Sequence, residues 1–252
     1  MKIQLHSDIH IEGRAGFAIP QMRSDVIILA GDIDVGMKGL RWAQHLTRIH
    51  DKPVIYIAGN HEFYRHDYHQ LLEEMRRYAS EYENLFFLEK EEVVINGVRF
   101  LGTTLWTNYY HEMGVVQRDK NMTVLNDTLN DHRLIKVGDV RFSAKNAYRE
   151  HEIAANWLRI KLNEHFKGKT VVVTHHAPSK KCNHPVYGEN PLSPGFVSNL
   201  EDLVKMADLW CYGHTHASLD INIGKCRLIS NQPGYQRERS PTPYDEDLAI
   251  EL

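Results

Sequence analysis

Residues 54–62 read Val-Ile-Tyr-Ile-Ala-Gly-Asn-His-Glu, an apolar run that gives way at once to polar residues. A short apolar run that ends at a glycine is typical of a strand buried on both faces of an α/β sheet. The same pattern recurs at other predicted strands. The residues that follow those strands are Asp8-Ile9-His10, Gly31-Asp32, Thr174-His175-His176 and Gly213-His214-Thr215-His216. Because open α/β sheets carry their sites outside the carboxyl ends of the strands, we expect these side chains to meet.

Strand and helix patterns alternate along much of the chain, which favours an α/β (α+β) fold. Trp42, Leu46 and Ile49 lie at helical spacing and predict one helix, and the apolar residues of 68–82 predict a second. A third helix is predicted to begin after Ser143, a suitable N-cap, and to end at Gly168.

Residues 104–142 fit this alternation less well. They are rich in asparagine and aromatic residues, and their helical periodicity is weak. Just before them, Asn96-Gly97 predicts a hairpin turn between two strands. We interpret residues 104–142 as an insertion or cap within a single domain that spans residues 1–252.

The composition excludes several classes of protein. Thirty Lys and Arg stand against thirty-three Asp and Glu, a formal net charge of −3 without the positive excess of a generic nucleic-acid binder. No apolar run is long enough to cross a bilayer, and the N-terminus lacks the apolar core of a signal peptide. Cys182, Cys211 and Cys226 show no paired spacing, which argues against a disulfide framework. We therefore expect a cytoplasmic protein with no membrane partner.

The polar residues at the strand ends supply seven good oxygen or nitrogen ligands, more than one metal ion needs. Such a set suits two divalent ions, about 3.5–4 Å apart, that share a bridging carboxylate. Two such ions, two aspartates and one bridging hydroxide leave a net charge of about +1, which favours a phosphate ester as substrate.

The ordered motifs Asp-x-His, Gly-Asp, Gly-Asn-His-Glu, His and Gly-His-x-His resemble those of the calcineurin-like metallophosphoesterase superfamily. They run from Asp8 to His216, so the resemblance covers nearly the whole chain. Residues 102–107 and 174–179 resemble those of a bacterial branch of predicted phosphohydrolases. The resemblance implies a four-layer β-sandwich flanked by helices, with a dinuclear metal site at its edge and a cap-like insertion.

The resemblance also implies a role for each motif residue. Three residues would hold the first metal ion, one would bridge, and three would hold the second. In that order they are Asp8, His10 and His216; Asp32; and Asn60, His175 and His214. His61 would be the catalytic histidine, near the scissile bond but not bound to a metal ion.

Two further residues are candidates for substrate contact. His175 and His176 compete for one ligand position, and the family pattern favours His175 because it directly follows the strand. His176 would then line the pocket or donate a hydrogen bond to a ligand. Arg133, in the predicted insertion, is either a surface residue or a phosphate contact.

The second motif departs from that of the protein Ser/Thr phosphatases, which continues Gly-Asp-x-x-Asp-Arg-Gly. Here residues 31–36 read Gly-Asp-Ile-Asp-Val-Gly, without the arginine and with the second aspartate displaced. The departure argues against a phosphoprotein substrate and leaves His61 without a simple aspartate partner. Glu62 is expected to support the turn that carries His61.

We therefore expect a divalent-metal-dependent phosphoesterase that hydrolyses a phosphodiester or phosphomonoester by attack of a metal-bridging hydroxide. The mixed imidazole, carboxylate and amide ligands suit manganese, iron or zinc. A small phosphate ester is the expected partner, and the net charge argues against extended nucleic acid. Two alternatives remain open: a DNA- or RNA-directed nuclease of the same fold, and a non-catalytic metal-binding interaction scaffold. The sequence does not indicate the oligomeric state.

Overall fold

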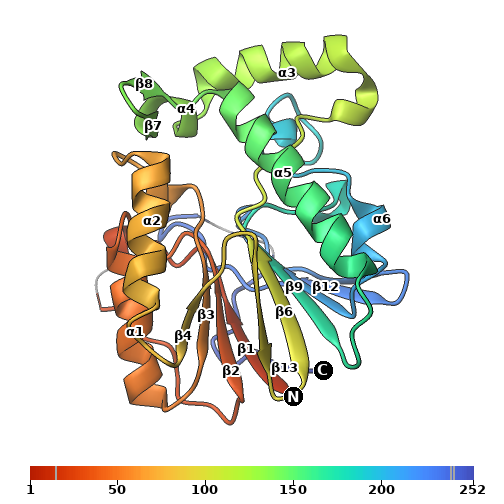
Figure 1. The fold of residues 1–252 in the computed structure, drawn as a ribbon. Coiled ribbons are helices and arrows are strands. Elements are labelled where there is room, and N and C mark those ends of the chain that lie inside the picture. Colours follow the sequence, from red (N-terminus) through yellow and green to blue (C-terminus); the bar gives the residue numbers. More distant parts are fainter. Residues whose placement is uncertain (15, 239, 241) are drawn as a thin grey trace.

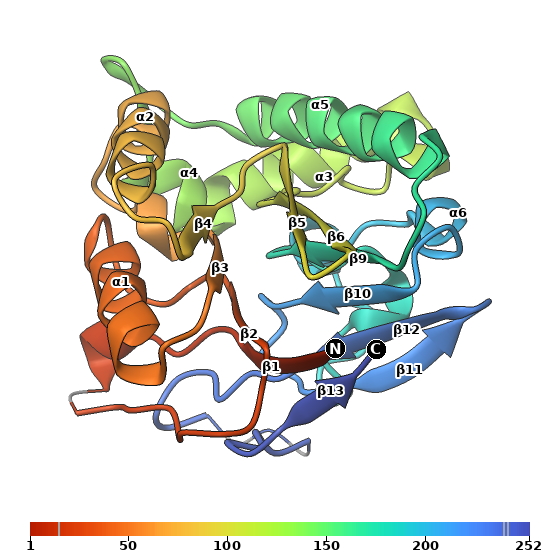
Figure 2. The same ribbon diagram turned by 60° about the horizontal axis from the view of Figure 1, so that its bottom comes forward.

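The computed structural model describes residues 1–14, 16–238, 240 and 242–252. Two mixed β-sheets lie face to face, and helices cover the outer face of each sheet (Figures 1 and 2). This arrangement confirms the predicted α/β (α+β) sandwich flanked by helices.

The first sheet has the strand order β13-β1-β2-β3-β4. Its strands are β1 (Lys2–His6), β2 (Val26–Ala30), β3 (Val54–Ile57), β4 (Leu85–Phe87) and β13 (Ala249–Glu251). The strands β1 to β4 run parallel, whereas β13 pairs antiparallel with β1 at the edge and brings the two termini together (Figure 2). The sequence did not predict β13, a three-residue strand in which only Ile250 is buried.

The second sheet has the strand order β11-β12-β10-β9-β6-β5. Its strands are β5 (Glu91–Ile95), β6 (Val98–Thr103), β9 (Thr170–Thr174), β10 (Leu209–Tyr212), β11 (Asp220–Ile223) and β12 (Cys226–Ser230). The four inner strands run parallel, and the edge strands β5 and β11 pair antiparallel with their neighbours. The predicted hairpin turn joins β5 to β6, with φ of 49° at Asn96 and 76° at Gly97.

Four helices of the described chain pack on the two outer faces. The helices α1 (Lys38–His50) and α2 (Tyr68–Ala79) cover the first sheet, and α5 (Ala144–Asn163) and α6 (Glu201–Val204) cover the second (Figure 1). Short 3₁₀ helices are η1 (Ile11–Gly13), η2 (His61–Phe63), η3 (His111–Met113), η4 (Lys180–Cys182) and η5 (Ser193–Gly195). Within the part of the chain that the structure describes, no helix has the length and apolarity that a bilayer crossing requires.

Two helix predictions need correction. The α5 N-cap is Ser143, which forms a capping box with Asn146, but the helix ends at Asn163, well before Gly168. In α1 the buried face contains Leu40, Ala43 and Leu46, whereas Ile49 is 49 % exposed. The apolar residues that predicted α1 therefore lie partly to one side of the face that the helix buries.

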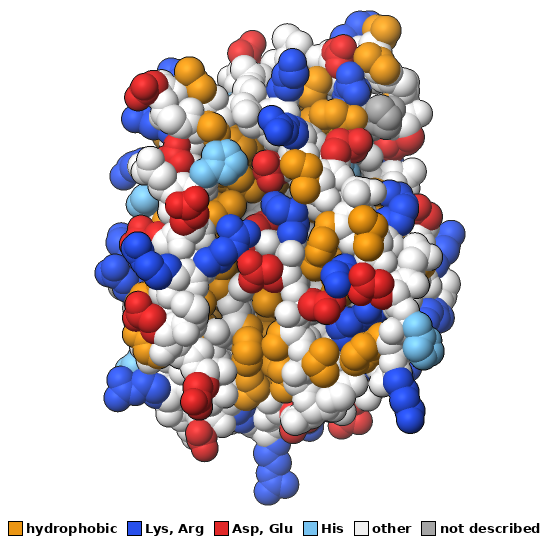
Figure 3. Space-filling model, viewed as in Figure 1, with side chains coloured by type: hydrophobic (Ala, Val, Ile, Leu, Met, Phe, Trp, Pro, Cys, Tyr) orange, Lys and Arg blue, Asp and Glu red, His pale blue; other side chains and the backbone are white. Residues whose placement is uncertain are grey.

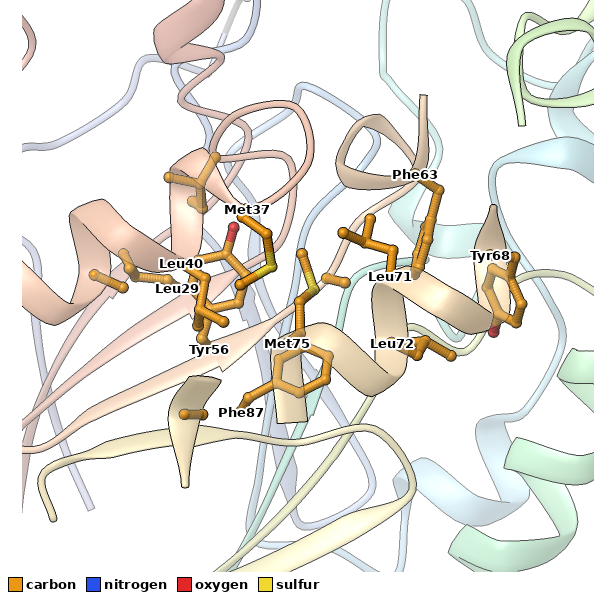
Figure 4. Packing of buried hydrophobic residues seen from close by; sticks show 14 of the residues in the cluster. Leu29, Met37, Leu40, Tyr56, Phe63, Tyr68, Leu71, Leu72, Met75 and Phe87 are labelled. Carbon is orange, nitrogen blue, oxygen red and sulfur yellow. The ribbon is translucent and has the colours of Figure 1, made fainter. Parts of the chain in front are cut away.

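Three hydrophobic clusters hold the layers together. One lies between the two sheets, one between α1, α2 and the first sheet, and one under α5 and α6. Figure 4 shows the second cluster, in which Leu40 and Met75 of the helices meet Leu29 and Tyr56 of the sheet. Full burial of such a side chain contributes roughly 1.5–3 kcal/mol, so these contacts fix the strands whose ends carry the site.

Residues 104–142 lie at the end of the molecule opposite the termini (Figure 1). Their elements are η3, α3 (Val115–Thr128), α4 (Asp131–Leu134), β7 (Lys136–Val137) and β8 (Val140–Arg141). The sequence did not predict α3, because its apolar residues do not share one face. Val116 is 70 % exposed, while Leu125 is fully buried.

The buried carboxylate of Glu89 holds the backbone where β6 leads into residues 104–142. It accepts hydrogen bonds from Thr103 Oγ1 (3.0 Å), the Thr104 amide (2.7 Å) and Lys90 Nζ (2.7 Å). Burial alone would raise the pKa of Glu89, but the charge and hydrogen bond of Lys90 and the bonds from Thr104 lower it below its ordinary value of 4.5.

We expect Glu89→Gln to lower the free energy of unfolding at pH 7 by about 2–3 kcal/mol, because it removes a buried charge that three donors satisfy. Since the pKa of Glu89 is lower in the folded protein, its stabilisation is complete above the unfolded pKa and is lost as the pH falls through the folded pKa. Urea unfolding between about pH 7 and pH 3 measures both effects. The control Glu91→Gln removes a surface carboxylate paired with Arg76, and an equal loss in this control would contradict the assignment.

Candidate metal centre and active site

Five parallel strands carry the predicted ligands at their carboxyl ends. The ligands follow β1 (Asp8, His10), β2 (Asp32), β3 (Asn60), β9 (His175) and β10 (His214, His216). The φ angles of Asp8, His10, Asp32, His214 and His216 are all positive, between 51° and 71°. Such angles are rare for residues other than glycine and persist where the surrounding structure fixes them, often at functional sites.

Glycines allow the strand ends to approach closely. A Cβ at Gly59 would collide with the Asp32 carboxylate, and a Cβ at Gly213 would collide with Ser7 Oγ and the carboxylate of Asp8. The Gly-Asn-His-Glu and Gly-His-x-His motifs therefore need their glycine for space beside the ligands.

The first group of ligands comprises Asp8, His10 and His216. His10 Nδ1 lies 3.1 Å from Glu12 Oε1, and His216 Nδ1 lies 2.5 Å from Glu238 Oε2. A carboxylate only accepts hydrogen bonds, so in the neutral rings each Nδ1 carries the proton and each Nε2 has a free lone pair. The Nε2 atoms of His10 and His216 nevertheless lie 3.2 Å apart, and Asp8 Oδ1 lies 3.4 Å from His216 Nε2. Lone pairs that converge in this way fit a cation.

In the second group, acceptor atoms also face one another without a donor between them. His175 Nδ1 lies 2.9 Å from the Ala30 carbonyl oxygen and must donate to it, so His175 Nε2 is an acceptor. That atom faces Asn60 Oδ1 at 3.0 Å and His214 Nδ1 at 3.1 Å. The amide of Asn60 cannot turn over, because its Nδ2 donates to Asp131 Oδ1 and to the Tyr64 hydroxyl. Acceptors held face to face again fit a cation.

Asp32 lies between the two groups. Its Oδ1 is 3.4 Å from His175 Nε2, and its Oδ2 is 3.8 Å from His10 Nε2. One carboxylate oxygen therefore faces each group, as a bridging ligand requires. The residues present fit two divalent ions that share Asp32.

The pKa shifts reflect this crowding of buried groups. Burial lowers the pKa of His175 to about 4, so its ring is neutral at pH 7. Burial alone would lower the pKa of His216, but hydrogen bonds to Asp8 and Glu238 raise it to about 10. Burial and the charges of Glu62 and Asp8 raise the pKa of Asp32 well above its ordinary value. The centre thus favours bound positive charge, whether protons or metal ions.

His61 lies at the wall of a pocket, beside the two groups. Its Nδ1 lies 3.1 Å from Glu12 Oε1, and its Nε2 lies 3.0 Å from the Tyr235 hydroxyl and 4.0 Å from Asp32 Oδ2. The ring packs on Tyr64 with 4.3 Å between centroids. Glu12 therefore supplies the carboxylate partner that the second motif does not provide.

The pocket has a volume of about 530 Å³. Its lining includes His61 and the proposed ligands Asp32, Asn60, His214 and His216, and the rest comes mainly from three other parts of the chain. These are Leu129, Asn130 and Asp131; several residues between Asn183 and Phe196; and Tyr235 and Glu238. Both the predicted insertion and the loop after β9 thus form walls of the pocket.

Residues 2–218 match the family described as calcineurin-like phosphoesterase. The chain belongs to this family. The uncharacterized protein L509 of Acanthamoeba polyphaga mimivirus is 25 % identical over 240 residues, which cover 85 % of this chain and 80 % of that protein. Among solved structures, the phosphopantetheinyl hydrolase of Mycobacterium tuberculosis has a TM-score of 0.73 and 19 % identity, over 94 % of this chain and 90 % of that one. Family and ligand groups together identify a metal-dependent phosphoesterase.

Two predicted substrate contacts of this phosphoesterase lie away from its pocket. Arg133 is exposed and donates to the Thr128 carbonyl, 2.6 Å away, so the structure does not bring it to the site. His176 is buried behind the ligands, with its Nδ1 3.2 Å from the Thr104 carbonyl oxygen and its ring against that of His214. Neither side chain lines the pocket.

Glu62 supports the ligands of the phosphoesterase, as predicted. Its buried carboxylate accepts from the amides of Asp32, Ile33 and Gly59 and from the Tyr56 hydroxyl. It ties the Gly-Asp turn after β2 to the Gly-Asn-His turn after β3. Glu62 therefore fixes the position of the predicted bridging ligand without facing the pocket.

The sequence did not predict four residues that hold the ligands or His61. They are Glu12, Asp131, Tyr235 and Glu238. The sequence contains a signal for Glu12, which continues the alternate spacing of Asp8 and His10. The others come from segments without a motif.

Proposed function

We propose that this protein is a dinuclear phosphoesterase that hydrolyses a phosphodiester or phosphomonoester, with a hydroxide bridging the two ions as nucleophile. The observation that carries the proposal is the convergence of acceptor atoms at two adjacent places that Asp32 joins. Bound divalent ions would supply positive charge for the phosphoryl oxygens and activate the attacking water.

The side chains of this chain then have separate tasks. Asp8, His10 and His216 would hold one ion, and Asn60, His175 and His214 the other. His61 lines the pocket and also lies within ligand reach of His10 and Asp32. In this proposal it stays outside both sets and donates a proton to the departing oxygen or stabilises the transition state. Glu12 accepts a hydrogen bond from His61 Nδ1, and Nε2, which lies 3.0 Å from the Tyr235 hydroxyl, would exchange that partner for the departing oxygen of the substrate.

Manganese, iron and zinc all suit this ligand set, and we propose manganese for the first experiments. We also propose a cytoplasmic location. Cys182, Cys211 and Cys226 are free and buried, which is consistent with a reducing compartment.

A nuclease acting on extended DNA or RNA is a less supported alternative. On the face shown in Figure 3, Lys and Arg are interspersed with Asp and Glu, without a continuous basic track. We therefore propose a small phosphate ester as the partner, without a membrane. No observation favours the non-catalytic scaffold, because the chain has a suitable residue at every proposed ligand position and a histidine at position 61.

A hydrolysis assay with three phosphate esters tests the proposal. The manganese-loaded enzyme is given p-nitrophenyl phosphate, bis-p-nitrophenyl phosphate and a phosphopantetheinyl diester, the last because of the structural neighbour's name. We expect metal-dependent release of product from at least one ester, and EDTA should abolish it. No hydrolysis of any ester, with two ions bound, would favour the scaffold.

We expect Glu12→Ala to lower kcat by about 10–100-fold even at saturating metal, because His61 loses the carboxylate that orients it. The metal affinity should also fall, since Glu12 also contacts His10. Glu12→Gln keeps an acceptor oxygen and should restore part of kcat. Steady-state kinetics across a metal titration separate the two effects.

Glu238→Gln is the matched control, because Glu238 contacts the ligand His216 but not His61. It should lower the metal affinity while kcat returns as the metal concentration rises. If Glu12→Ala also regained full kcat at saturating metal, Glu12 would not be a positioning residue for His61.

A further inference from the structure

Apart from the histidines of the metal centre, the described residues that line the pocket include no cationic side chain. Among the residues of the described chain that line it, none is lysine or arginine. Two acids, Asp131 and Glu238, lie on its walls instead. Away from the metal ligands, a second phosphate or carboxylate on the substrate would therefore meet these acids and no lysine or arginine among the described lining residues.

The walls also provide surface for an uncharged group. Tyr64, Tyr187, Phe196 and Tyr235 offer aromatic rings, and asparagines also line the pocket. A volume of about 530 Å³ is within the usual range for a small organic ligand. Aromatic walls with a few polar groups bind planar or apolar ligands and fix their orientation.

His184 adds a hydrogen-bond donor to this wall. Its Nδ1 accepts from the Val186 amide at 3.2 Å, so the proton of the neutral ring lies on Nε2. The side chain is 7 % exposed, and its Nε2 has no hydrogen-bond partner among the described residues. An unpaired buried donor is unfavourable, and a ligand acceptor that reached it would relieve this cost.

We propose that the enzyme acts on phosphate esters whose pocket-bound arm is uncharged, presents an aromatic or apolar surface and carries an acceptor for His184 Nε2. This inference rests on the proposed hydrolysis and specifies its substrate class. In the reaction, the oxygen of water bonds to phosphorus, the bond from phosphorus to one ester oxygen breaks, and that oxygen takes up a proton.

Three diesters with the same leaving group test the charge of the arm. They are p-nitrophenyl thymidine 5′-phosphate, the same compound with an added 3′-phosphate, and ethyl p-nitrophenyl phosphate. We expect kcat/KM to be at least about tenfold higher for the 3′-hydroxyl compound than for the 3′-phosphate. Equal values, or a preference for the 3′-phosphate, would overturn the inference.

A charge introduced at the pocket should change this preference. Tyr187→Lys places a cation on the pocket wall at a side chain that is 60 % exposed, and it should reduce the discrimination against the 3′-phosphate several-fold. The matched control is Val186→Lys, a neighbouring residue that is 64 % exposed and does not line the pocket. Equal effects of the two variants would show that general attraction, rather than the pocket, sets the preference.

Two substitutions that introduce amide side chains test the role of His184. His184→Asn keeps an acceptor for the Val186 amide but loses the Nε2 donor, whereas the longer His184→Gln can place a donor near the Nε2 position. We expect His184→Asn to lower kcat/KM about tenfold for the thymidine ester and little for the ethyl ester, and His184→Gln to restore part of it. An equal loss on both esters, or no loss, would overturn the role of His184.

Failure of the inference can be told from failure of the proposed function. If the wild-type enzyme hydrolyses none of the three diesters with metal bound, the proposed hydrolysis is wrong for diesters. If it hydrolyses all three with similar kcat/KM, only the proposed selectivity is wrong.

Discussion

His61→Ala should lower kcat by about 10²–10⁴-fold while the metal content stays unchanged. The side chain faces the pocket, 4.0 Å from Asp32 Oδ2, yet belongs to neither set of proposed ligands. Its loss removes the donor for the departing oxygen and leaves the metal ligands in place. Steady-state kinetics on bis-p-nitrophenyl phosphate, with metal analysis of the same sample, measure both quantities.

The matched control for this variant is His69→Ala, which removes an exposed imidazole on α2. We expect wild-type kcat from this control. A near-normal kcat of His61→Ala on every ester tested would contradict the catalytic role, and loss of both ions would place His61 among the ligands.

Asp32→Asn should weaken the binding of both ions, by at least about 100-fold for the ion that loses the charged oxygen. The carboxylate faces both ligand groups and also accepts from the His61 amide at 2.9 Å. An amide supplies only one oxygen and no charge, so it cannot bridge in the same way. Calorimetric titration with Mn²⁺ measures the two affinities.

Asp34→Asn is the control for Asp32→Asn. The Asp34 carboxylate accepts from the Val35 amide and belongs to none of the groups of potential metal ligands among the described residues. Its variant should bind metal as the wild type does. Two tightly bound ions in Asp32→Asn would contradict the bridging assignment.

The sequence predicted which side chains meet at the strand ends better than it predicted the residues that hold them. Each proposed ligand lies within four residues of the end of a buried parallel strand, and hydrophobic burial fixes where such a strand ends. The position of His175 or Asn60 therefore depends mainly on local sequence and on the sheet order. The motifs determine which residue type stands at each of these positions, so five short segments of sequence specify all the proposed ligands.

The supporting residues depend on long-range packing instead. Glu238 reaches His216 from a C-terminal segment without regular structure, and Asp131 reaches Asn60 from α4. No periodicity or spacing predicts which loop will fold back over a sheet. Arg133 shows the converse, since its position two residues after Asp131 did not bring it to the pocket.

The helix α3 shows another limit of the sequence pattern. Its valines point in several directions, and Leu125 alone is buried within the helix. Hydrophobic periodicity predicts helices that cover a core along one face, whereas α3 contacts the rest of the protein at few positions. The absence of an amphipathic pattern was thus consistent with a helix in a cap.

The central claim is that two ions share Asp32 and together support hydrolysis. The most direct test is a titration of metal-free protein with Mn²⁺ in which the bound metal and the hydrolysis of bis-p-nitrophenyl phosphate are measured in the same samples. The account predicts that binding saturates at two ions per chain and that the rate rises with the second ion. Saturation at one ion with full activity, or two bound ions with no activity on any ester, would contradict it.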